Sequence, residues 1–179
     1  MSDLKYSKYA LRKSFIVTTL FALAGVLATL RIFAWAVSLP LIIFYITLLV
    51  NTYFSIRCFF DLVPRKNIKQ QSIDLVLGAL YLILAASLGN QLLFSYTATI
   101  LFAMATLKYV LLLPSIGHFT SLKRKIFIDC LGIIACILTL GGVLLGYGLL
   151  ATWLWAGIFT FANIHLLFIK PMYNYYDSK

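Results

Sequence analysis

Basic residues near the ends of long apolar runs are the first candidates for chemistry in this sequence. A pattern of one small polar, one aliphatic and one basic residue occurs three times: Ser55-Ile56-Arg57, Thr106-Leu107-Lys108 and Asn163-Ile164-His165. A proline follows each basic residue by six or seven positions. If repeated units pack around a common axis, Arg57, Lys108 and His165 form a basic ring that binds an anion, a lipid phosphate or an acidic group. The simpler interpretation places each cation near a helix C-terminus, where it suits the helix dipole.

Two aspartates, Asp74 and Asp129, are the candidate charge partners inside the membrane. Each follows an isoleucine at the start of an apolar run, so we expect both in the first turn of a helix, where a carboxylate suits the N-terminus. The alternative is that they pair with Lys108 or Arg57 across the bundle and act in gating or proton relay.

The elements that must position these residues are predicted to be membrane-spanning helices. Apolar residues make up 63% of the 179-residue chain and charged residues only 11%, and the mean hydropathy is +0.98. Soluble domains carry roughly 45–50% apolar and about 25% charged residues. The sequence therefore predicts an integral membrane protein.

Three apolar stretches are each too long for one crossing, since about 20 residues span the hydrocarbon core. They are interrupted at Arg31, at Gly89-Asn90-Gln91 and at Gly146-Tyr147-Gly148. The sequence thus predicts an all-α fold in a single domain, 1–179, with six transmembrane helices. These form three repeated two-helix hairpins at approximately 14–60, 72–117 and 126–170.

The basic residues predict the orientation. Of the 15 lysines and arginines, 14 fall on one side of the predicted spans and only Arg31 lies on the other. Such a bias marks the cytoplasmic side, so we expect both termini in the cytoplasm and a place in a bacterial inner membrane. Two predicted loops on that side are candidate sites for a partner protein or for anionic lipid of the inner leaflet: Arg65, Lys66 and Lys69, and Lys123, Arg124 and Lys125. The net charge of +10 does not indicate nucleic acid, because the charges cluster between spans.

Small residues recur in the first helix of each predicted hairpin, among them Gly25, Gly78 and Gly132. They allow helix backbones to approach closely. Three two-helix repeats over nearly the whole chain resemble the acid-resistance HdeD-like small membrane proteins, which also repeat a helical hairpin three times. The resemblance implies the six-helix fold and carries over no functional residue.

The sequence offers little for catalysis. The cysteines Cys58, Cys130 and Cys136 form no C-x-x-C pair, and the two histidines stand apart from any Ser/His/Asp order or paired carboxylate. We therefore expect no enzyme, no cofactor and no metal.

Two functions remain open at this point. The first is an oligomeric interaction or sensor subunit, a homo-oligomer whose basic cytoplasmic face docks a cytosolic partner protein or anionic lipid. The second is a small channel or transporter with an anion-favouring basic inner mouth. The sequence favours the first, because charges deep in the spans, which transporters usually keep, are expected to be absent.

Overall fold

The computed structural model describes residues 8–32, 34–60, 67–116 and 120–171. Within these ranges the chain forms six helices and no strand, and every helix is long and apolar enough to cross a membrane. The helices are α1 (Lys8–Thr29), α2 (Trp35–Phe59), α3 (Ile68–Ala86), α4 (Gln91–Ile116), α5 (Thr120–Leu144) and α6 (Gly148–Ile164), and α6 continues into a π-helical turn, η2 (His165–Ile169). This is the architecture of a multi-pass helical membrane protein.

The predicted breaks within the apolar stretches are confirmed. The chain leaves α1 at Arg31, turns between α3 and α4 at 87–90, and turns between α5 and α6 at 145–147. Gly146 makes the last turn possible, because its φ of +87° lies in the left-handed region. The amide of Tyr147 donates to the carbonyl of Gly142 and that of Gly146 to the carbonyl of Val143, which is the Schellman closure of α5.

Two helices begin earlier than the sequence predicts. The side chain of Asn67 accepts from the backbone N–H of Gln70 and caps α3, so Asp74 lies in the second turn and not in the first. Helix α5 begins at Thr120, so Lys123 to Lys125 belong to a helix and not to a loop, and Asp129 lies in its third turn. The apolar run marks where the chain becomes hydrophobic, whereas the helix starts at a preceding polar turn.

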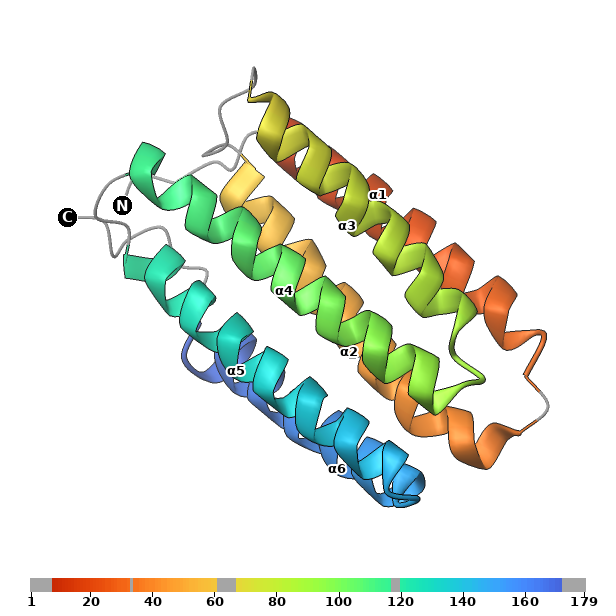
Figure 1. The fold of residues 1–179 in the computed structure, drawn as a ribbon. Helices are drawn as coiled ribbons and strands as arrows, with labels where there is room; N and C mark the ends of the chain where they lie inside the picture. Colours follow the sequence, from red (N-terminus) through yellow and green to blue (C-terminus); the bar gives the residue numbers. More distant parts are fainter. Residues whose placement is uncertain (1–7, 33, 61–66, 117–119, 172–179) are drawn as a thin grey trace.

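The helices form two layers of three (Figure 1). One layer holds α3, α4 and α5 side by side, and the other holds α1, α2 and α6 behind them. The first two hairpins each lie within one layer, whereas α5 and α6 pair across the layers. The three hairpins therefore do not surround a common threefold axis.

At the end where α3 turns into α4, the layers are closed by a dense aromatic core. Phe44 of α2 is fully buried, and its ring lies 3.8 Å from that of Trp155 and 4.3 Å from that of Phe159, centroid to centroid. On the other side of the core Phe94 meets Phe44 edge to face. Such stacked and edge-on pairs pack this part of the interior.

Candidate functional site: a cavity at the basic end of the bundle

One end of the bundle carries most of the described positive charge. We call the end at which α1, α3 and α5 begin the basic end, and the opposite one the far end. Exposed cations at the basic end are Lys8, Arg12, Lys69, Lys123, Arg124 and Lys170. Arg31 is exposed at the far end. Of the predicted surface cations, Arg65 and Lys66 lie outside the described residues, and Lys125 is buried.

A cavity of about 1220 Å³ lies between the two layers and extends from the basic end to beyond the middle of the bundle, where Leu82 of α3 and Leu101 of α4 line it. It is lined by α1, α2, α3, α4 and the start of α5. Along α2 it extends from Phe60 to Leu48, which is about 18 Å at 1.5 Å per residue. The inner end of the cavity lies next to the aromatic core, so the cavity enters the bundle from the basic end.

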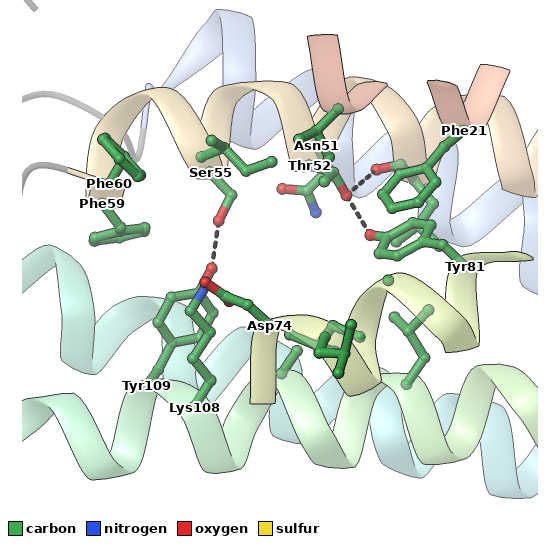
Figure 2. A pocket seen from close by; sticks show the side chains of 18 of the residues that line it. Phe21, Asn51, Thr52, Ser55, Phe59, Phe60, Asp74, Tyr81, Lys108 and Tyr109 are labelled. Atoms are coloured by element: carbon green, nitrogen blue, oxygen red, sulfur yellow. Dashed lines mark hydrogen bonds and ion pairs between the residues drawn. The ribbon is translucent and has the colours of Figure 1, made fainter. Parts of the chain in front are cut away.

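Hydroxyl groups from three helices meet in this cavity (Figure 2). Thr52 of α2 is hydrogen-bonded to Tyr81 of α3, and Ser55 of α2 to Tyr109 of α4. The Thr52 hydroxyl also donates to the carbonyl of Leu48 at 2.8 Å. These bonds cross between helices within the apolar layer and hold α2, α3 and α4 in register around the hollow.

An ion pair stands on the wall nearer the basic end. Lys108 Nζ lies 2.5 Å from Asp74 Oδ1 and joins α4 to α3. The two side chains are 17% and 40% exposed, so neither is fully buried. Gln70 Nε2 donates to the carbonyl of Lys108 at 3.2 Å and fixes the same two helices together. Lys108 was one of the alternative partners of Asp74, and the pair is present, but it joins neighbouring helices of one hairpin and does not reach across the bundle.

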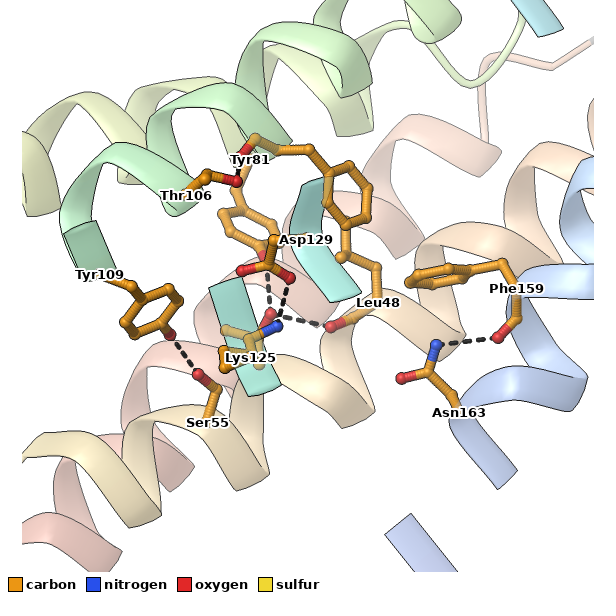
Figure 3. A network of polar contacts seen from close by, with 11 residues as sticks. Leu48, Ser55, Tyr81, Thr106, Tyr109, Lys125, Asp129, Phe159 and Asn163 are labelled. Carbon is orange, nitrogen blue, oxygen red and sulfur yellow. Dashed lines mark hydrogen bonds and ion pairs between the residues drawn. The ribbon is translucent and has the colours of Figure 1, made fainter. Parts of the chain in front are cut away.

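A second ion pair lies on the inner wall and is almost completely buried (Figure 3). Lys125 Nζ lies 2.6 Å from Asp129 Oδ1, and the side chains are 6% and 1% exposed. Both residues are on α5, one turn apart, so Asp129 pairs on its own helix and not with Lys108 or Arg57. The ammonium also lies 5.8 Å from the ring centroid of Tyr109. These two charges are therefore buried inside the bundle, within the first eight residues of the candidate span Leu122–Leu144.

A smaller cavity of about 230 Å³ lies on the other side of this pair, between α5 and α6. It is mainly apolar, and Ile158 and Leu131 on its wall are half or more exposed at the bundle surface. Asn51, Phe102 and Asp129 line both cavities. These three side chains therefore form the partition between the two spaces.

The three residues of the predicted basic ring are placed differently from one another. Lys108 lines the large cavity, whereas Arg57 and His165 line neither cavity. Arg57 is half-buried near the end of α2, and His165 begins the π-helical turn η2, whose backbone bond runs from the Lys170 amide to the His165 carbonyl at 2.8 Å. Because the hairpins do not share an axis, the structure brings only Lys108 to the cavity.

Sequence reasoning missed the roles of Tyr81, Tyr109 and Phe102. The sequence analysis did not single out these residues, yet Tyr81 and Tyr109 are buried at 7% exposure each and point into the bundle. The sequence did hold a signal for both residues, because each lies well away from the ends of its helix. In the structure, each is hydrogen-bonded to a hydroxyl-bearing residue of α2. Phe102 carries no such signal, because aromatic residues are common in spans.

No model of a known protein family, no curated protein and no solved structure matches this chain. The HdeD-like resemblance accordingly stays a prediction.

Proposed function

We propose that this protein is a small membrane transporter that works by alternating access, with the large cavity as its solute-binding site. The observation that carries the proposal is the cavity itself: it holds two ion pairs and two hydroxyl pairs within the apolar layer, and it is closed toward the far end by packed aromatic rings. The arrangement corresponds to a carrier open on one side.

The buried ion pair supports a role beyond stability. Charged residues inside a membrane are costly, and they commonly mark substrate or ion pathways. A buried pair is also weak evidence for stability, because apolar residues of similar volume often do as well or better. Lys125 and Asp129 line the cavity, and so they are placed to contact a solute.

A carrier fits better than an open channel. A channel needs a continuous path, whereas Phe44, Phe94 and Trp155 fill the bundle between the cavity and the far end. The excess of exposed cations favours the cytoplasm for the basic end, so the cavity is proposed to face inward. A bacterial inner membrane is the location that we propose on the same grounds.

Two-sided cysteine labelling in proteoliposomes tests this function. The background carries Cys58→Ala, Cys130→Ala and Cys136→Ala, and Ala105→Cys places one thiol on the cavity wall. Ala103→Cys is the matched control, because Ala103 is on the same helix but is exposed on the outside of the bundle. Gly89→Cys, in the α3–α4 turn, reports the far end.

An alternating-access carrier gives fast labelling of the Ala105→Cys variant by an impermeant maleimide from the basic side. It also gives slower labelling of the same variant from the far side, since the site is then exposed only in the minor state. Equal rates from both sides would indicate a channel and would contradict the carrier. Labelling from the basic side alone, under every condition, would indicate a static vestibule and would also contradict it.

The exposed cations of the basic end favour a second function, a membrane subunit that docks a cytosolic partner or anionic lipid, as a homo-oligomer. Lys123 and Arg124 are both exposed in the first turns of α5, and Lys8 and Arg12 are exposed at the start of α1 at the same end of the bundle. Mass determination of the intact particle in nanodiscs, prepared from the native host, tests this alternative. A stoichiometric partner lost in a Lys123→Ala, Arg124→Ala variant supports it, and a bare monomer contradicts it.

A further inference from the structure

One buried oxygen on the cavity wall lacks a hydrogen bond. Within the described ranges, Asp129 Oδ2 has no hydrogen-bond partner, although Oδ1 of the same carboxylate accepts from Lys125. The side chain is 1% exposed, so water does not compensate at its surface. A buried acceptor left unmatched costs about 1–3 kcal/mol, and more when it is charged. Such an atom calls for an explanation, and a donor supplied by a ligand is one.

The position of this oxygen favours the ligand explanation. Asp129 lines both cavities and belongs to the partition between them. Other buried unmatched side-chain atoms of the described chain, such as Ser38 Oγ and Ser95 Oγ, belong to residues that line neither cavity. The unmatched acceptor thus belongs to the wall of a cavity of about 1220 Å³, which is large enough for a small molecule.

The surrounding charges determine what the ligand must bring. Three lysines line the cavity: Lys108 is paired with Asp74 and Lys125 with Asp129, whereas Lys13, near the start of α1, lies 4.3 Å from the ring centroid of Phe60. On the inner wall the one lysine, Lys125, already has its carboxylate. The hydroxyls of Thr52 and Ser55 are likewise paired with tyrosines. What the inner wall still requires is a donor, an N–H or O–H, and a donor on a charged nitrogen makes the stronger bond to a carboxylate.

The rest of the wall indicates an apolar body on the same ligand. Most lining side chains are apolar, and the wall includes Leu75 and Leu82 of α3, which are 77% and 52% exposed on the outside of the bundle. Between them Gly78 adds no side chain, and the space beside it is open to at least 4 Å. The cavity therefore reaches the lipid-facing surface along α3, where an apolar chain can enter from the bilayer.

We propose that the cavity takes an amphipathic molecule whose polar end carries a hydrogen-bond donor, an amine or a hydroxyl, and that Asp129 Oδ2 accepts that bond. The apolar chain lies toward the opening along α3. This proposal rests on the transporter function, because it names the class of solute that the same cavity binds.

Protection of the Ala105→Cys thiol tests the class of ligand. Four probes share a straight chain of ten carbons and differ at the polar end: decylamine and decanol donate, methyl decanoate accepts only, and decanoate is an anion. We expect the two donors at saturation to slow maleimide labelling from the basic side by about tenfold, and the ester and the anion to leave it unchanged. The rate for Gly89→Cys must stay constant with every probe, which excludes a general effect on the membrane.

Variants then assign the atom. Asp129→Asn, combined with Ala105→Cys, is expected to abolish the difference between donors and the ester. Ser95→Ala is the control, because Ser95 Oγ is also a buried unmatched oxygen but the residue lines neither cavity, and this variant should keep the difference. Equal protection by all four probes in the unmodified Asp129 background would overturn the proposal without any need for the Asp129 variant to fold. A missing donor effect with two-sided labelling intact would overturn the ligand class alone and leave the transporter function standing.

Discussion

The ring of Phe102 lies directly over Gly132, on the face of α5 that turns toward α4. A Cβ built on Gly132 would stand 2.8 Å from both Cδ1 and Cε1 of that ring. A side chain at this position would force the ring to shift, so the glycine allows the ring its present position. Because Phe102 belongs to the partition between the cavities, Gly132 controls that partition without lining the larger cavity.

Gly132→Ala is therefore expected to destabilise the protein. The added methyl group forces the Phe102 ring to shift within a packed region, and overpacking of this kind costs about 1–3 kcal/mol. Gly141→Ala is the control on the same helix, because nothing lies within 4 Å of its Cβ position. Thermal unfolding in nanodiscs measures both, and equal melting temperatures for the two variants would contradict the tight packing.

Removal of one partner from the buried pair is expected to be costly. Lys125→Met leaves the Asp129 carboxylate buried without its cation, which costs about 3–5 kcal/mol in comparable pairs. The double change Lys125→Met with Asp129→Leu removes both charges and is expected to recover most of that loss. Unfolding free energies from denaturant titration in mixed micelles measure the series.

The control for this series is Lys123→Met, two residues away on the same helix and exposed. Its expected effect lies within about 0.5 kcal/mol of zero, as for other surface changes. A Lys125→Met variant that is as stable as Lys123→Met would show that the pair is not buried in the membrane-embedded protein.

The number and type of the helices could be predicted from the sequence, because glycines and polar residues interrupt the apolar runs where the chain turns. The starts of α3 and α5 could not, because composition changes where the chain becomes apolar, while a helix starts at its cap, as at Asn67. That difference of one to two turns moved Lys125 from a predicted loop into the bundle. It also moved Asp129 from a helix end to a cavity wall.

The ion pair itself left a signal in the sequence. Lys125 and Asp129 are four positions apart, and residues at this spacing lie on one face of a helix. The cavity had no comparable signal, because it depends on which hairpins share a layer. The spacing of apolar residues along a helix shows that the helix packs against other helices. It does not show which helices these are. For the same reason the ring of Arg57, Lys108 and His165 was expected only if the three hairpins packed around a common axis. The two-layer packing does not meet that condition.

The hydroxyl pairs are expected to contribute little each. A double-mutant cycle with Ser55→Ala and Tyr109→Phe should give a coupling energy of about 0.6 kcal/mol, the average for hydrogen bonds between membrane helices. Tyr96→Phe on the same helix is the control, since Tyr96 is 56% exposed. A coupling energy of zero would mean that the Ser55–Tyr109 bond is not formed in the bilayer.

The ion pair near the mouth of the cavity is expected to influence which reagents enter, according to their charge. Lys108 is 17% exposed beside Asp74, and its removal leaves a carboxylate as the nearest charge on that wall. With Ala105→Cys as the reporter, Lys108→Gln should raise the labelling rate by a cationic methanethiosulfonate relative to an anionic one by about threefold or more at low salt. Added salt should reduce the change, because screening weakens the field of partly exposed charges.

Lys69→Gln is the control for this prediction. It removes a charge from the same end but outside the cavity, and it should leave the ratio of the two labelling rates as it is. If both lysine variants changed the ratio equally, the surface charge of the basic end would select the reagent, and Lys108 would have no special place on the path to the cavity.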